Sequence, residues 1–163
     1  MKKLLLILLL APALLKAQCI TKKDAFTGKE IKSGITFLIA AIPGSPVFGF
    51  GKNGDDPAAL AFSFTVDLKP SSFDTQKMLL MIKFVSGDVK KFHANKQTTV
   101  IAQTNNVIVG FAADITPEDI SYFQLNQIAA IRLCYTGDES VGYDTEISEG
   151  KAKKIIKSVA CIL

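Results

Sequence analysis

The chain has 163 residues, of which 19 are basic and 15 acidic, and its formal net charge is +4. Three of the lysines lie in residues 1–17, so residues 18–163 carry 16 basic and 15 acidic side chains. A net charge so close to zero creates no long-range attraction for DNA, RNA or anionic lipid. Arg132 is the only arginine that could read a phosphate or a base edge. The composition therefore argues against nucleic acid as a partner.

Residues 1–17 have the layout of a secretory signal peptide. Two lysines precede an apolar run over residues 4–15, and Ala17 supplies a small residue at the expected cut. The run is twelve residues long, whereas a membrane-spanning helix needs about 20. We therefore expect cleavage before Gln18, export to the periplasm or beyond, and no transmembrane segment in the mature chain. A retained anchor or a buried core helix is the alternative reading of this run.

The first part of the mature chain predicts an exposed hairpin followed by buried strands. Residues 21–33 are mostly polar and fit a solvated edge hairpin. Residues 35–42 are apolar on both faces of a strand, which predicts a buried central strand. A short strand over residues 47–50 leads to Asn53–Gly54, a strong hairpin signal.

Residues 58–68 are the clearest strand, because large apolar side chains alternate with small or polar ones. The side chains expected to face the core are Leu60, Phe62, Phe64, Val66 and Leu68.

Two further antiparallel hairpins follow. Residues 77–85 and 88–93 flank a Ser-Gly turn, and residues 98–103 and 107–114 flank a turn with two asparagines. The same period-two pattern places Met78, Leu80, Ile82 and Phe84 on one face.

The period changes at Thr116, which is a good helix N-cap before Pro117 and two acidic residues. Ile120 and Phe123 are three residues apart, so we expect one or two helical turns to pack on the sheet. Residues 127–135 and 140–147 return to strand.

Ser148 should cap a last helix. Its apolar stripe is formed by Ala152, Ile155, Ile156 and Val159. Residues 18–163 thus predict a single α+β domain with about nine strands, a mostly antiparallel, hairpin-rich curved sheet or sandwich packed by a C-terminal helix.

Three cysteines lie in the mature chain: Cys19, Cys134 and Cys161. An odd number leaves at least one unpaired in a monomer. In the chain-entropy model a Cys19–Cys161 bridge contributes about 5 kcal/mol and a Cys134–Cys161 bridge about 3.5 kcal/mol. The helical angle of Cys161, away from the apolar stripe, slightly favours Cys19–Cys161 as the candidate disulfide, while three free thiols remain an alternative. Lipid attachment at Cys19 is disfavoured because Gln18, the preceding residue, is not small.

Few residues suggest chemistry. His93 is the only histidine and lies in a lysine-rich hairpin end, where a surface histidine is the expected reading. Gly49 to Lys52 lacks the glycine and serine or threonine positions of a phosphate loop. Asp55–Asp56 and Asp138–Glu139 are acidic pairs in turns and lack the spacing of a calcium loop. We therefore identify no catalytic, cofactor-binding or metal-ligating residue and no cofactor.

Both ends of the chain resemble small exported proteins of Bacteroidota. The resemblance rests on the lysine and leucine-rich start ending at Ala17–Gln18, on residues 24–28 (DAFTG) and on the closing strand, hairpin and helix over residues 128–163. It implies export in a Gram-negative cell and assigns no activity and no site residue.

Two functions remain after these exclusions. The first is a secreted or periplasmic, non-catalytic binding or interaction domain, whose partner is a protein or a small apolar ligand. The second is an envelope hydrolase whose carboxylates come from several loops. A pocket with converging carboxyl groups of perturbed pKa would favour the hydrolase.

Overall fold

The computed structural model describes residues 18–25, 27–38, 45–104 and 106–163. The predicted signal peptide, residues 39–42 of the predicted buried strand, and Asn105 of the predicted turn lie outside these residues. All statements about the fold concern the described part of the chain.

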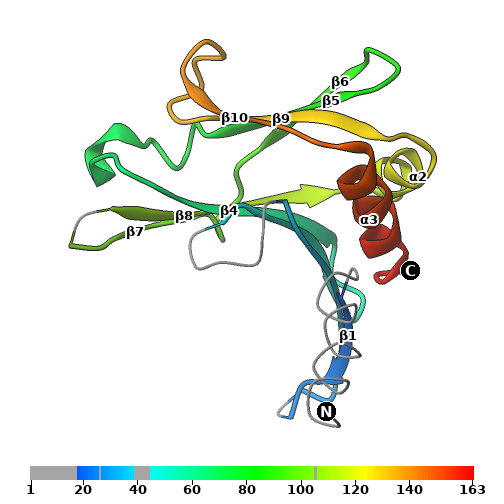
Figure 1. The fold of residues 1–163 in the computed structure, drawn as a ribbon. Helices are drawn as coiled ribbons and strands as arrows, with labels where there is room; N and C mark the ends of the chain where they lie inside the picture. Colours follow the sequence, from blue (N-terminus) through cyan, green and yellow to red (C-terminus); the bar gives the residue numbers. More distant parts are fainter. Residues whose placement is uncertain (1–17, 26, 39–44, 105) are drawn as a thin grey trace, which may run out of the picture.

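The described strands form two antiparallel sheets that face each other as two layers (Figure 1). The larger sheet has the order β1-β2-β3-β4-β8-β7. Its strands are β1 (Gln18–Lys23), β2 (Glu30–Phe37), β3 (Val47–Asn53), β4 (Ala58–Val66), β7 (Thr99–Ala102) and β8 (Val107–Ile115).

The smaller sheet has the order β10-β9-β5-β6. Its strands are β5 (Leu79–Phe84), β6 (Val89–His93), β9 (Ile128–Cys134) and β10 (Gly142–Glu146). The helices are the 3-10 turn η2 (Pro70–Ser72), α2 (Pro117–Leu125) and the C-terminal α3 (Glu149–Ala160). The predicted class, an antiparallel α+β fold with a C-terminal helix, is confirmed.

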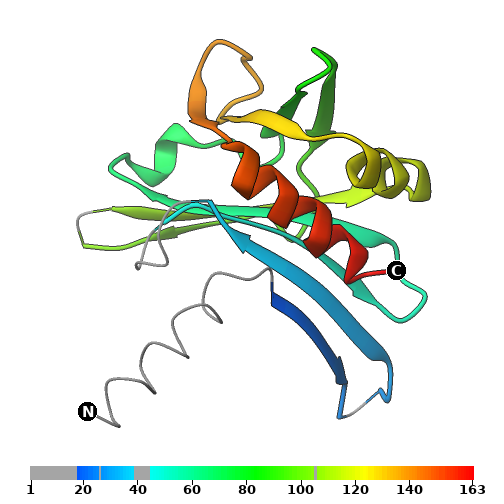
Figure 2. The same cartoon turned by 45° about the vertical axis from the view of Figure 1, so that its right-hand side comes forward.

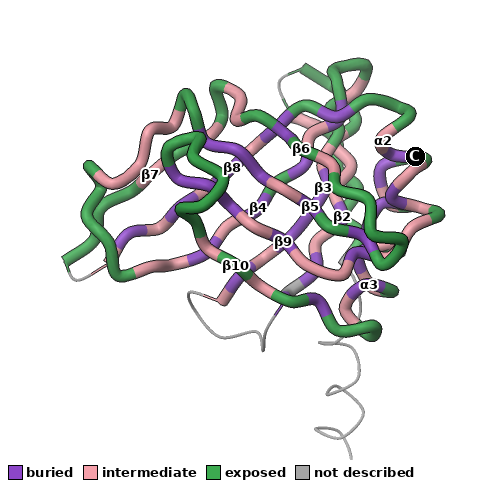
Figure 3. Tube along the Cα trace, turned by 90° about the horizontal axis from the view of Figure 1, so that it is seen from above, coloured by how far each residue is buried: buried purple, intermediate pink, exposed green. Residues whose placement is uncertain are grey.

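The core lies between the two sheets, and Figure 3 shows buried segments where the strands of one layer cross those of the other. Phe123 of α2 joins the layers at one end of this core. Its ring centroid lies 5.3 Å from that of Phe50 on the larger sheet, and 5.7 Å and 5.8 Å from those of Phe84 and Phe92 on the smaller sheet. Helix α2 therefore packs back on the sheets as its Ile120 and Phe123 spacing predicted.

At the β1 end the larger sheet bends away from the smaller one, and α3 lies along β2 and β3 there (Figure 2). This approach requires a glycine at position 34. A Cβ atom built on Gly34 would lie only 2.0 Å from the carbonyl oxygen of Ser158 on α3. Ser158 is fully buried, and its hydroxyl donates to the carbonyl oxygen of Ile155, 2.8 Å away.

A disulfide between Cys19 and Cys161 fastens the edge strand β1 to the end of α3. The residue opposite Cys19 in the sheet register is Gly34, the position at which α3 touches β2. Lys32 adds a contact by donating from its ammonium group to the carbonyl oxygen of Leu163. The end of α3 is thus joined to β1 by a covalent bond, and α3 is held against β2 by close backbone packing.

Local signals set several turns and one cap. The backbone has positive φ at Gly28, Gly54 and Gly87, three of the hairpin turns expected from the sequence. Thr116 accepts a hydrogen bond from the Asp119 backbone N–H, and the Asp119 carboxylate accepts one from the Thr116 N–H. This reciprocal capping box explains why α2 begins where the sequence predicted.

Four details of the prediction are wrong. Strand β2 begins at Glu30, five residues before the predicted start, and lies next to the edge strand rather than at the centre of its sheet. Leu68 is exposed, because β4 ends at Val66 before the turn into η2. Ser148 is the N-cap of α3, but its side chain makes no capping hydrogen bond.

The fourth detail that differs from the prediction is the apolar stripe of α3. Ser158 is buried in place of Ile156, which is only half-buried, because the helix turns its small Ser158 toward Gly34.

The remaining cysteine, Cys134, is free and buried, with its sulfur 3.8 Å from that of Met81. Burial raises the pKa of the Cys134 thiol, which further lowers its reactivity. We expect the native protein to resist a maleimide reagent and the denatured, non-reduced protein to take up one label per chain. Mass spectrometry checks this stoichiometry, and two or three labels per denatured chain would contradict the assigned pairing.

Candidate functional site

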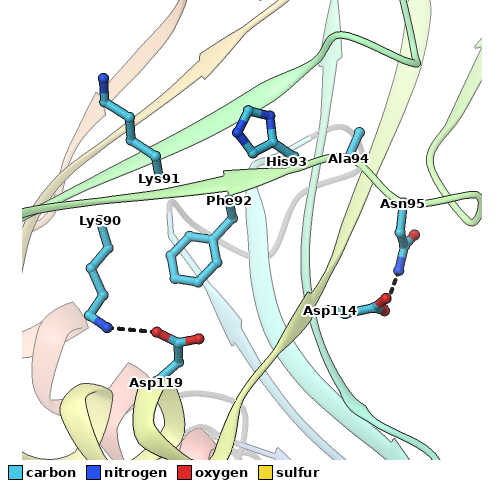
Figure 4. A pocket seen from close by; sticks show the side chains of 8 residues that line it. All are labelled: Lys90, Lys91, Phe92, His93, Ala94, Asn95, Asp114 and Asp119. Atoms are coloured by element: carbon cyan, nitrogen blue, oxygen red, sulfur yellow. Dashed lines mark hydrogen bonds and ion pairs between the residues drawn. The ribbon is translucent and has the colours of Figure 1, made fainter.

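A hollow of about 420 Å³ lies beside β6 and is also lined by Asp114 of β8 and Asp119 of α2 (Figure 4). Its lining includes His93, Asp114 and Asp119, the residue types that a hydrolase would use. Figure 4 shows Lys90 and Phe92 on the side of β6 that faces Asp119, and His93 on the opposite side of the strand. The histidine therefore does not converge with the carboxylates.

Both carboxylates in this hollow already have partners. The Asp119 carboxylate lies 2.6 Å from the Lys90 ammonium and also completes the capping box with Thr116. Asn95 donates its side-chain amide to the Asp114 carboxylate, 2.7 Å away. Burial alone raises the pKa of Asp119, but the hydrogen bonds from Lys90 and Thr116 outweigh it and hold that pKa below its usual value. Both carboxyl groups are therefore engaged in structural contacts near the start of α2.

A pKa that folding lowers makes stability depend on pH. Asp119 contributes stability above its unfolded-state pKa, and the contribution is lost as the pH falls through the lower folded-state pKa. We therefore expect the free energy of unfolding to fall less steeply between neutral and acidic pH in Asp119→Asn than in the wild type. Denaturant unfolding at a series of pH values measures this, with Lys90→Met as a second variant that should also flatten the profile. Parallel profiles for all three proteins would contradict the assignment.

The other sequence candidates stand apart from this hollow. The Asp56 carboxylate lies 3.2 Å from the Lys29 ammonium and accepts a hydrogen bond from Asn53, so it belongs to the β3–β4 turn. Asp138 accepts hydrogen bonds from the backbone and hydroxyl of Ser140, and Glu139 pairs with Lys91. Within the described ranges, no group of three or more histidine, cysteine, aspartate or glutamate residues could hold a metal ion.

The carboxyl groups whose pKa values are clearly shifted share one direction. The pKa of each of these groups is lowered, because nearby hydrogen bonds or cations favour the charged form. These residues are Asp74, Asp88, Asp119, Asp138, Asp144 and Glu149.

The outer face of the smaller sheet is charged. Arg132 of β9 forms two hydrogen bonds of 2.6 Å with the carboxylate of Asp144 on β10. This pairing raises the pKa of Arg132 and lowers that of Asp144. Lys83 and Glu146 line the same surface around a shallow hollow of about 380 Å³.

Among the residues that the structure describes, none that faces outward over the central area of the larger sheet is charged. Along β4 and β8 the buried core residues alternate with residues that face outward, whereas in β3 Gly49 is buried like its neighbours Phe48 and Phe50. The strand register aligns the outward residues into rows, for example Ile35, Gly49, Ala61 and Ala112. Lys22 and Asp114 lie only at the ends of such rows.

We call this surface the uncharged face. It is formed by Ser33, Ile35, Val47, Gly49, Gly51, Ala59, Ala61, Ser63, Thr65, Thr99, Ile101, Ile108, Gly110 and Ala112. The residues of the uncharged face come from five separate strands, so they lie together only because of the order of these strands in the sheet. The small outward side chains of residues 58–68 were the one signal of it in the sequence.

Comparison with known proteins adds no family. No protein-family model matches the chain, and neither a curated protein nor a solved structure matches it. Among the described helices, none is both long and apolar enough to cross a bilayer.

Proposed function

We propose that this chain is an exported, non-catalytic interaction domain that binds a partner protein through its uncharged face. The partner surface that fits is itself flat and uncharged, since small side chains such as Ala59, Ala61 and Ala112 offer shape and apolar contact but no ionic attraction. The absence of charge over this face carries the proposal. The opposite surface of the same domain has the mixed charge that is typical of a solvated sheet.

Its extent also supports a docking role. With strands about 4.8 Å apart and an outward residue about every 6.8 Å along each strand, the fourteen residues of the face cover about 460 Å². A standard protein interface buries about 800 Å² on each partner. The face thus covers somewhat more than half of that area, and the largest apolar patch on a typical monomer, about 300–600 Å², often has a function.

Two features support export. The predicted signal peptide over residues 1–17 directs secretion. The bond between Cys19 and Cys161 is of the kind that persists in an oxidising compartment.

The hydrolase hypothesis has less support. General acid catalysis by a carboxyl group requires one whose pKa is raised so that it stays protonated. The six carboxyl groups named above all have lowered pKa values, and Asp114 and Asp119 are engaged in structural contacts. No observation favours this function over the interaction domain.

Capture from the envelope fraction of the source cell tests the proposal. We expect the wild-type domain to retain a protein that Ala61→Lys fails to retain, because the lysine places a charge in the middle of the contact. Val89→Lys is the matched control, since Val89 is also an exposed strand residue but belongs to the smaller sheet. Equal capture by wild type and Ala61→Lys, or loss with Val89→Lys alone, would contradict the proposal.

A further inference from the structure

The two sheets have four edge strands, and three of them carry charged residues. Charged side chains on an edge strand oppose pairing with a strand of another molecule. The charged edge residues are Lys22 and Lys23 on β1, Lys90 and Lys91 on β6, and Asp144 and Glu146 on β10. Strand β7 has none, since its sequence is Thr-Val-Ile-Ala.

The inner side of β7 is well fixed to β8. The hydroxyl of Thr98 donates to the carbonyl oxygen of Ala112 and accepts from the Ala112 N–H, both at 3.0 Å. At the other end, the Gln103 N–H donates to the carbonyl oxygen of Asn106, 2.8 Å away. These contacts hold β7 as a straight and defined edge.

Among the described residues, no strand pairs with the outer side of β7, and η2 is the other element that lies close to this strand besides β8. In an antiparallel pair, hydrogen bonds to the neighbour alternate along the strand. Since Gln103 bonds toward β8, the N–H and carbonyl groups of Val100 and Ala102 face away from the sheet. Ile101, on the uncharged face, has 55% of its surface exposed. The edge therefore offers both hydrogen bonds and an apolar side chain to an added strand.

We propose that β7 pairs with β7 of a second copy of this chain, which joins two six-stranded sheets into one continuous sheet. Identical strands that pair antiparallel are related by a two-fold axis, the commonest symmetry of protein dimers. The absence of charge on β7 favours pairing with an identical strand for two reasons. Two identical charged edges would repel each other, whereas two uncharged edges do not. An uncharged edge also has no preference for a partner strand of opposite charge. With the two-fold axis at Ile101, this residue contacts its own copy and Val100 lies opposite Ala102 of the second chain, which adds apolar burial.

This pairing does not depend on the proposed function. It uses the backbone edge of the larger sheet, and apart from Ile101 at that edge it leaves the uncharged face open on both copies. A doubled sheet presents two such faces side by side.

Sedimentation of the soluble protein recovered after expression of the full chain tests the pairing. We expect the wild type to sediment as a dimer and Ile101→Lys as a monomer that still unfolds in one cooperative thermal transition. Ile20→Lys is the matched control, because Ile20 is an exposed isoleucine on β1, the opposite edge of the same sheet, and it should remain dimeric. Ala102→Pro removes an outward N–H without a charge and should also give a monomer.

A mixing experiment addresses the symmetry. Ile101→Lys and Ile101→Glu should each be monomeric alone and should form a dimer when mixed, because the two-fold axis brings their side chains together. The inference would be overturned if the wild-type protein sedimented as a monomer at every concentration tested. It would also be overturned by a dimer that survives both Ile101→Lys and Ala102→Pro.

Discussion

Removing the disulfide in a Cys19→Ser/Cys161→Ser variant will lower the free energy of unfolding by about 3–5 kcal/mol. The bond closes a loop over a sequence separation of 142 residues, so its loss frees much conformational entropy in the unfolded chain. The native state also loses the anchor of β1, an edge strand with mostly exposed side chains. Reversible denaturant unfolding measures the change.

A reducing agent provides the control for this variant. It should bring the wild type down to the stability of the double variant and leave the double variant unchanged, since Cys134 is in no disulfide. Amide hydrogen exchange should accelerate first in β1. A loss below about 1 kcal/mol, or a double variant that still responds to the reductant, would contradict the role assigned to Cys19 and Cys161.

Gly34→Ala will destabilise the domain by about 2–3 kcal/mol or prevent it from folding. The added methyl group would lie 2.0 Å from the Ser158 carbonyl oxygen and 2.8 Å from the Ser158 Cα. Both are backbone atoms, so the clash can be relieved only by moving α3 away from β2. Movement of α3 would also strain the nearby bond between Cys19 and Cys161.

Gly51→Ala is the matched control for Gly34→Ala. Gly51 lies on the neighbouring strand β3, opposite Ser33, and a Cβ atom there would approach only the Lys32 carbonyl oxygen, at 3.9 Å. Gly51→Ala should lower the free energy of unfolding by less than about 1 kcal/mol, since alanine is normally no less stabilising than glycine in a strand. Thermal unfolding of the two variants makes the comparison, and equal melting temperatures would refute the close helix packing at Gly34.

Local features of the sequence predicted local structure well. The alternation at Leu60, Phe62 and Phe64 depends only on which face of a strand is buried, and the capping of α2 depends only on residues 116–119. Each of these signals is contained in a few neighbouring residues, so no knowledge of the remaining fold is needed.

Features that arise from contacts between distant elements were not predictable in the same way. Gly34 has no special local conformation, and only the approach of α3 shows why a glycine is needed there. The uncharged face depends on which strands are neighbours, and β4 pairs with β8, more than 40 residues further along the chain. In the same way, β7 could be recognised as an edge only from the strand order.

The most direct test of the uncharged face as an interaction surface is the rate at which a thiol at position 61 reacts. Because Cys19 and Cys161 are bonded and Cys134 is buried, Ala61→Cys adds the one exposed thiol among the described cysteines. We predict that envelope extract slows maleimide labelling of Ala61→Cys and leaves Val89→Cys, on the other sheet, unaffected. Equal labelling rates for Ala61→Cys with and without extract would contradict the account.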